Sequence, residues 1–244
     1  MKRTYADLHL RPDLRNNEQV THMIRKASQL GYRLIAIPIP QNFPEEKIQK
    51  LQNICKENKV DFASRADLKP KTSKELIKNL RNLRRRFEIT AVMCESKKVA
   101  RQAAKDRRVD LLNFPSYNPQ KIFFDKAEAE LASNALASLE INIKPLLTLA
   151  GRARIRLLSC LRREVTIAES FHIPIVISSE ASNELLMRKP REIAALTSLF
   201  DLDKSSALEA VSKNPMTIIK RNREKLSPKF VAPGIRLIRR RKDC

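Results

Sequence analysis

The 244-residue chain contains only three glycines, and they lie far apart, at Gly31, Gly151 and Gly234. A GxGxxG turn or a Walker-type loop needs clustered glycines so that the backbone can approach a phosphate group. The sequence therefore excludes a dinucleotide-binding site of the Rossmann type and a P-loop nucleotide site.

Cysteine and histidine are also scarce. The four cysteines are scattered, at Cys55, Cys94, Cys160 and Cys244, and form no CxxC pair. A zinc ribbon or a redox motif needs closely spaced thiolates. Only three histidines occur in the whole chain. We therefore expect no metal and no other cofactor, and reduced thiols in an intracellular protein.

Long apolar runs are missing as well. Every uncharged stretch is well short of the ~20 apolar residues that cross a membrane. The chain opens on charged and polar residues, without the apolar region of a signal peptide. We expect a cytoplasmic protein with no membrane partner.

Positive charge is abundant and concentrated. The chain has 49 Lys/Arg against 27 Asp/Glu, a formal charge of +22. Residues 65–108 hold 15 Lys/Arg against five Asp/Glu, residues 144–163 six against none, and residues 220–244 ten against two. Because the rest of the chain is nearly neutral, this pattern predicts a polyanionic partner, namely nucleic acid. An acidic membrane surface would need an amphipathic helix with a broad apolar face, and the last segment offers only Ile235, Leu237 and Ile238.

Short apolar runs alternate with longer helical patterns along the chain. The runs predict strands at residues 3–10, 33–39, 60–68, 89–94, 109–114, 139–144 and 173–178. Such alternation is typical of βαβ crossovers, so the sequence predicts an α/β, TIM-barrel-like parallel barrel with outer helices. An eighth strand would come from residues 199–202, where the signal is weak. We expect the barrel domain over residues 1–225 and a flexible basic tail over residues 226–244.

Functional groups of a parallel barrel lie at the carboxyl ends of its strands. The predicted strands place acidic, basic and hydroxyl side chains there, at Asp7, His9, Arg65, Asp67, Glu95, Lys144, Ser178, Ser179 and Glu180. The triplet Asp7-Leu8-His9 resembles the end of the first strand in the PHP family, metal-dependent phosphoesterases on a distorted seven-stranded barrel. That strand ends in His-x-His, and here Asp7 stands in place of the first histidine.

A two- or three-metal centre needs more histidines than this chain has, since only His22 and His172 remain. The resemblance therefore implies a PHP-like barrel without the metal chemistry. A metal-dependent phosphoesterase that uses Asp7, His9 and Glu180 stays an alternative.

A narrower resemblance covers about residues 3–223. Its motifs are LEINIKPLL at residues 139–147, GRARIRLL at 151–158, HIPIVISSEA at 172–181, KPREI at 189–193 and NPMTII at 214–219. VDLLNFP at residues 109–115 and the opening Asp7-Leu8-His9 fit the same pattern. In this order and spacing the motifs resemble the barrel protein of archaeal and eukaryotic ribonuclease P, called protein component 3 in archaea.

The resemblance implies a subunit that supports the catalytic RNA in removing 5′ leaders from precursor tRNA. Its implied partners are that RNA, precursor tRNA through the complex, and other protein subunits, notably a small sheet-containing one. Because the RNA carries the catalysis in this family, we expect no independent catalytic site in the chain. A general basic RNA-binding architectural protein remains a second alternative.

The arginines at 152, 154 and 156 are the most informative cations. They open a predicted helix, where cations oppose the helix dipole at a cost of up to ~1 kcal/mol each. Three of them in one turn favour phosphate binding over a structural role. The other predicted RNA-binding residues are Arg65, Lys69, Lys71, Arg84, Arg85, Lys144, Lys189, Arg191, Arg239, Arg240 and Arg241. Aromatic residues are few, so we expect phosphate contact and shape recognition more than base stacking.

Overall fold

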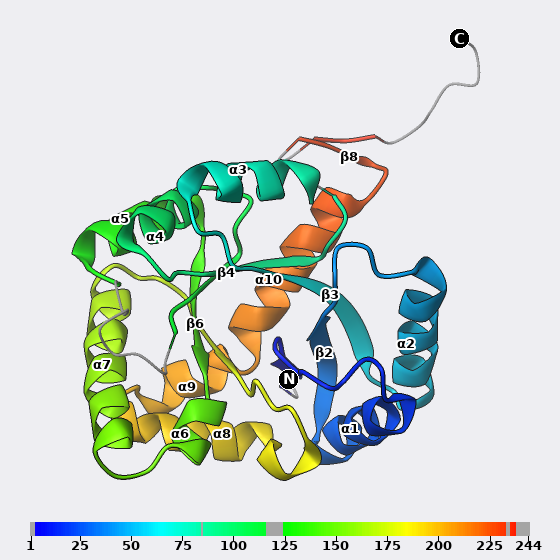
Figure 1. The fold of residues 1–244 in the computed structure, drawn as a ribbon, viewed down its shortest axis with the longest axis horizontal. Coiled ribbons are helices and arrows are strands. Elements are labelled where there is room, and N and C mark those ends of the chain that lie inside the picture. Colours follow the sequence, from blue (N-terminus) through cyan, green and yellow to red (C-terminus); the bar gives the residue numbers. More distant parts are fainter. Residues whose placement is uncertain (1–2, 84, 116–123, 233–234, 238–244) are drawn as a thin grey trace.

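Seven parallel strands form the centre of the protein in a computed structural model, which describes residues 3–83, 85–115, 124–232 and 235–237. Each strand is hydrogen-bonded to the next strand along the chain, so the sheet order is the sequence order. The strands are β1 (Tyr5–Asp7), β2 (Tyr32–Pro38), β3 (Asp61–Leu68), β4 (Ile89–Met93), β5 (Leu111–Asn113), β6 (Ser138–Asn142) and β7 (Ile175–Ser178). The predicted parallel barrel is confirmed, and Figure 1 shows helices around its strands.

Helices connect successive strands on the outside of this barrel. They are α1 (Asn17–Leu30), α2 (Glu45–Glu57), α3 (Ser73–Asn82), α4 (Lys97–Ala104), α5 (Lys126–Ala135), α6 (Lys144–Thr148) and α7 (Gly151–Ser170). After β7 come η2 (Glu184–Leu186), α8 (Pro190–Leu196), η3 (Thr197–Phe200), α9 (Lys204–Ala210) and α10 (Lys213–Leu226). Local sequence sets the ends of several helices. Asn16, Thr72 and Ser96 each accept a hydrogen bond from a backbone N–H three residues ahead, and Gly31 ends α1 in the left-handed region.

Two apolar layers hold the barrel together. A large layer lies between the strands and the outer helices. A smaller one lies inside the barrel and combines side chains from β1, β2, β3, β4, β5 and β7 with Ile218 and Ile219 of α10. Ile89 and Leu111 of this inner layer are the first residues of their strands. Helix α10 therefore closes the amino end of the barrel.

The barrel has a seam between its first and last strands, because β1 and β7 do not pair with each other. Hydrogen bonds from other groups bridge the seam. The Ala6 N–H donates to the Val211 carbonyl at 3.1 Å, and the Asn214 side chain donates to the Ile175 carbonyl at 2.8 Å. No strand forms at residues 199–202, where the eighth-strand signal was weak, since η3 continues to Phe200 and Asp201 then adopts a left-handed backbone conformation.

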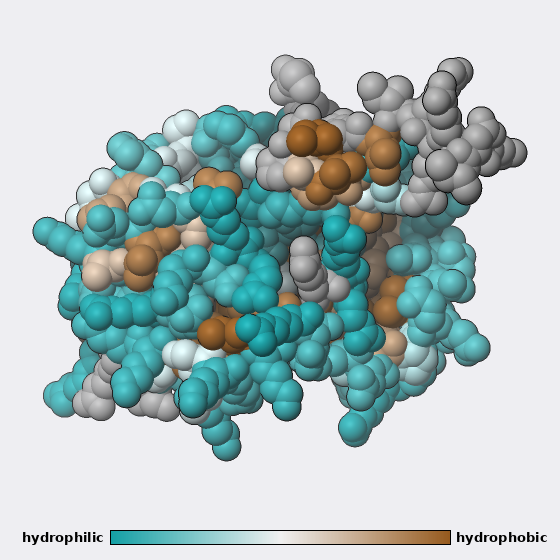
Figure 2. Space-filling model, turned by 90° about the horizontal axis from the view of Figure 1, so that it is seen from above, coloured by the Kyte–Doolittle hydropathy of each residue, from teal (hydrophilic) through white to brown (hydrophobic). Residues whose placement is uncertain are grey.

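The expected tail begins with a short ribbon. Helix α10 continues to Leu226, and β8 (Phe230–Ala232) then pairs antiparallel with β9 (Ile235–Arg236). Val231, Ile235 and Leu237 are exposed at 53%, 58% and 41% of their surface. Figure 2 looks onto the side of the molecule that carries α3 and this ribbon, and shows a group of apolar side chains on a mostly hydrophilic face. Residues 238–244 lie outside the described part.

Candidate nucleic-acid interface

A buried ion pair lies at the carboxyl end of the barrel. Arg65 of β3 is only 1% exposed, and its Nη1 and Nη2 donate to the two carboxylate oxygens of Glu140 at 2.5 and 2.7 Å. Its Nε donates to Asp67 at 2.6 Å and Nη1 also donates to the Leu8 carbonyl at 2.7 Å. We expected Arg65 to contact RNA. The structure removes it from that set because its guanidinium is buried and held by carboxylates.

Glu140 of β6 is as deeply enclosed as its partner. Ser178 of β7 donates a hydrogen bond to its Oε1 at 2.7 Å, and Asn113 of β5 donates to its Oε2 at 3.1 Å. Burial opposes the charge of the carboxylate, yet Arg65 outweighs it and holds the pKa of Glu140 below its usual value. Burial lowers the pKa of Arg65, but the carboxylates of Glu140 and Asp67 outweigh this effect and leave that pKa raised. Both groups are therefore charged across the physiological range.

The remaining polar groups at this end are held by one another. The His9 Nδ1 lies 3.0 Å from the Asn142 Oδ1, and its Nε2 lies 3.2 Å from the Asp67 Oδ2. Against the effect of burial, Arg65 and then His9 lower the pKa of Asp67 far below its usual range. Asp7 of β1 accepts from the Ser179 N–H at 3.0 Å and from the Ser179 hydroxyl at 2.5 Å. These last two bonds join the β1 side of the seam to the β7 side.

This arrangement does not fit the metal centre of the PHP family. The carboxylates of Glu140 and Asp67 are neutralised by a protein cation, Asp7 is engaged by Ser179, and Glu180 pairs with Arg11 at 3.4 Å. Among the described residues, no group of three or more His, Cys, Asp or Glu side chains is arranged to hold a metal ion. The residues of the phosphoesterase alternative are thus committed to protein partners.

Free positive charge lies at the start of α7. Arg152, Arg154 and Arg156 are all exposed, and no acidic residue occurs in the first turn of this helix. The helix also begins without a side-chain cap, so its first backbone N–H groups add to the positive potential. The three arginines predicted from the sequence therefore share one short segment with an uncapped helix N-terminus. That combination attracts phosphate.

Three predicted lysines follow the carboxyl ends of strands. Lys69 and Lys71 come directly after β3 and are exposed. Lys144 begins α6 after β6 and is half-buried, with its Nζ 3.2 Å from the Ser182 hydroxyl. Since the carboxyl ends of parallel strands share one end of the barrel, these lysines lie at the same end as the start of α7.

Two further predicted residues lie elsewhere. Lys189 and Arg191 follow β7, so the general rule for parallel barrels would place them at the carboxyl end. Instead the Arg191 Nε donates to the hydroxyl of Tyr5 at 3.3 Å, and Tyr5 is the first residue of β1. The long loop after β7 has therefore brought α8 alongside the amino end of the barrel. Both side chains are exposed there.

Arg85 and Arg86, which lie between α3 and β4, also belong to the amino end. Arg85 is exposed and adopts a left-handed backbone conformation with φ 63°. Arg84 and the tail arginines Arg239, Arg240 and Arg241 lie outside the described residues. The described cations thus fall on two ends of the barrel, which the linear charge pattern did not separate.

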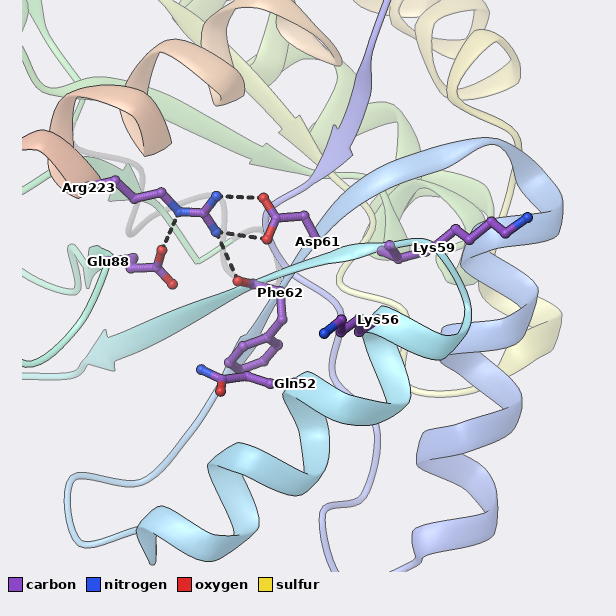
Figure 3. A pocket seen from close by; sticks show the side chains of 8 residues that line it. Gln52, Lys56, Lys59, Asp61, Phe62, Glu88 and Arg223 are labelled. Carbon is purple, nitrogen blue, oxygen red and sulfur yellow. Dashed lines mark hydrogen bonds and ion pairs between the residues drawn. The ribbon is translucent and has the colours of Figure 1, made fainter.

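A hollow of about 540 Å³ at the amino end lies between α2, β3 and α10 (Figure 3). Its most prominent side chain is Arg223 of α10, which donates to both oxygens of Asp61, to Glu88 at 2.6 Å and to the Phe62 carbonyl at 3.0 Å. Because Arg223 is committed to these acceptors, it fixes α10 to the barrel and is unavailable to an external anion.

The sequence prediction did not include Lys98, a further exposed cation in a first helical turn, although Ser96 caps its helix whereas α7 begins without a side-chain cap. Lys98 is exposed in the first turn of α4, which contains no acidic residue. The absence of an acidic residue from the first helical turn was the signal that could have found it.

No helix in the described part of the chain is long and apolar enough to cross a membrane.

Comparison with known proteins agrees with this picture. The family model described as RNase P subunit p30 matches residues 4–227. Ribonuclease P protein component 3 of Methanosarcina barkeri is 29% identical over 231 residues, which cover 95% of this chain and 93% of that protein. The corresponding protein of Methanocaldococcus jannaschii is 28% identical over 153 residues, 63% of this chain and 66% of that protein.

A solved structure shares the fold. One chain in the cryo-EM structure of archaeal ribonuclease P with mature tRNA superposes with a TM-score of 0.83 at 22% identity, covering 98% of this chain and 100% of that chain. A putative prolidase from Bifidobacterium longum reaches a TM-score of 0.57 at 10% identity, which reflects the barrel alone. On the family match, which spans nearly the whole barrel, this chain belongs to the ribonuclease P subunit p30 family.

Proposed function

We propose that this protein is a subunit of ribonuclease P that binds and stabilises the catalytic RNA during removal of 5′ leaders from precursor tRNA. It contributes phosphate contacts and no catalytic group of its own. Its partners are the catalytic RNA, precursor tRNA through the complex, and further protein subunits that include a small sheet-containing one.

One observation carries this proposal. The carboxyl end of the barrel, where parallel-barrel enzymes keep their reacting groups, is filled by the Arg65–Glu140 ion pair. Beside it, α7 opens on exposed arginines that pair with no carboxylate among the described residues. A protein that needs to neutralise RNA phosphates requires accessible cations. It does not require converging metal ligands, and the described residues provide none.

The first prediction concerns the α7 arginines. Replacing Arg152, Arg154 and Arg156 by alanine leaves folding intact, because all three side chains are exposed, and weakens RNA binding. The slope of log K against log salt becomes shallower by about one for each phosphate that the variant no longer neutralises. The measurement is a salt titration of the affinity for the catalytic RNA. As a matched control, alanine at Arg25, Lys50 and Lys56 removes the same charge from exposed positions on α1 and α2.

An unchanged slope in the α7 variant, or an equal change in the control, would remove these arginines from the RNA footprint. Equally tight binding to bulk tRNA or duplex DNA would favour a general architectural protein instead. Hydrolysis of a phosphoester by the protein alone, abolished by EDTA, would favour the phosphoesterase alternative.

A further inference from the structure

A second basic surface lies at the amino end of the barrel, around a groove of about 340 Å³. Apolar residues from three elements line much of it: Leu80 and Leu83 belong to or follow α3, Leu226 ends α10, and Phe230 begins β8. Phe87, which precedes β4, completes the apolar lining and is half-buried like Phe230. The groove therefore offers two phenyl rings at a partly open surface.

Cations surround this apolar lining. Arg85 and Arg107 are exposed, and none of the hydrogen bonds or ion pairs of the described structure engages their side chains. Lys225 of α10 is half-buried at the same groove. Burial and the neighbouring Arg221 lower the pKa of Lys225, although Asp110 acts in the opposite direction. An added anion would relieve this concentration of positive charge.

The acidic group at the groove is already neutralised. Asp110 accepts from the Arg221 Nη2 at 2.8 Å and from the Thr90 N–H at 3.0 Å. Arg108, the remaining cation of the lining, donates to Asp106 at 2.6 and 2.8 Å. The net field at the groove is therefore that of Arg85, Arg107 and Lys225.

We propose that this groove binds one unpaired nucleotide of an RNA, with its base against the apolar lining and its phosphates on Arg85, Arg107 and Lys225. The inference rests on the proposed function and adds a binding site at the opposite end of the barrel from the start of α7. An aliphatic and aromatic floor with a cationic rim matches the two halves of a nucleotide, a flat base and a charged phosphate.

The size of the groove favours a single base. Its volume is at the lower end of the range of ligand pockets, and an α-helix of roughly 10 Å diameter needs more room. The overall scarcity of aromatic residues argues against a row of stacked bases, and two phenyl rings at one groove suit one base. The protein would then hold RNA at both of its ends.

The test uses the full-length protein and two RNA hairpins that carry 2-aminopurine at the same position, unpaired as a single-nucleotide bulge in one and paired in the other. The bulged hairpin binds about tenfold more tightly, in line with the stacking energy of one base, and its fluorescence changes on binding. The variant R107A/K225A loses this preference. The variant K105A/K220A, which removes equal charge from nearby exposed positions outside the groove, keeps it.

A second variant separates apolar contact from charge. Phe230→Ala abolishes the preference for the bulge and leaves the salt dependence of binding unchanged. Equal affinity of the wild-type protein for the two hairpins would overturn the inference, as would equal losses in R107A/K225A and K105A/K220A. If the groove instead binds an acidic segment of a protein partner, the wild-type protein would bind the two hairpins with equal affinity. In either case the α7 arginines would still govern binding to the catalytic RNA, so the proposed function is tested separately.

Discussion

Arg65 shows how burial changes the role of a charged residue. The sequence places it near the carboxyl end of a strand in a basic segment, which favours a surface role. The register of β3 instead turns the side chain into the barrel, where Glu140 of β6 faces it 75 residues away along the chain. A pairing between two strands that are not neighbours in the sheet leaves no local signal in a sequence. The arginines of α7 were predictable because the start of a helix leaves a local signal in the sequence.

Replacing Arg65 by methionine is expected to destabilise the protein by about 3–5 kcal/mol, because it leaves Glu140 charged and buried without its partner. Urea unfolding monitored by circular dichroism gives this number. The double variant R65M/E140M is expected to lose less than the sum of the two single variants, since it removes both charges together. A loss below about 0.5 kcal/mol for R65M would mean that the ion pair contributes little.

Capping residues and glycine in the local sequence determine where several helices begin and end. Caps at Asn16, Thr72 and Ser96 and the glycine after α1 set the ends of their helices. Helix α6 was missed because it has only five residues and begins at Lys144-Pro145, directly after a strand. The position of α8 was also missed, since it depends on the path of the loop after β7 and not on its own residues.

Helix α7 carries a buried carboxyl group on its inner face. Glu164 is 3% exposed, and burial raises its pKa to about 8 despite the nearby Arg163. The folded protein therefore holds this proton up to about pH 8, whereas the unfolded chain releases it near the ordinary value of 4.5. Between these two values the folded state binds more protons, so stability falls as pH rises.

We expect Glu164→Gln to flatten this pH dependence. In the wild-type protein the loss has an upper bound of about 1.4 kcal/mol for each pH unit between about pH 5.5 and 8. Glu128, whose pKa burial raises to about 7, is present in both proteins and contributes equally below that pH. The measurement is the free energy of unfolding at a series of pH values. Parallel curves for the two proteins would show that Glu164 does not hold its proton in the fold.

Helix α10 is the element that closes the amino end, and Arg223 fastens it there. Replacing Arg223 by alanine is expected to cost about 1–2 kcal/mol, because it removes bonds to Asp61 and Glu88 from a side chain that is partly exposed to solvent. Thermal unfolding measures the effect. Lys220→Ala on the same helix, where the side chain is exposed and lies outside this network, is the matched control with little change expected.

At the scale of the whole molecule, the sequence predicted the barrel but not how its two ends are built. Strands alternating with helices were enough to predict the parallel barrel and its seven strands. The seam between β1 and β7, and the use of α10 to close one end, depend on contacts between the two ends of the domain. The charge pattern correctly located the basic segments. It could not tell that residues 85–87 and 107–108, which precede β4 and β5, meet residues 225–230 at the amino end while the start of α7 lies at the other.

The central claim is that this protein supports the catalytic RNA in precursor tRNA cleavage and has no catalytic site of its own. The most direct measurement is 5′-leader removal from precursor tRNA by ribonuclease P assembled from the catalytic RNA and its protein subunits, with and without this chain. We expect cleavage to fall when the chain is left out, to recover on its addition, and to recover less with the R152A/R154A/R156A variant. The purified protein alone is expected to leave precursor tRNA intact. Metal-dependent cleavage by the protein without RNA, or full activity of the assembly in its absence, would contradict the account.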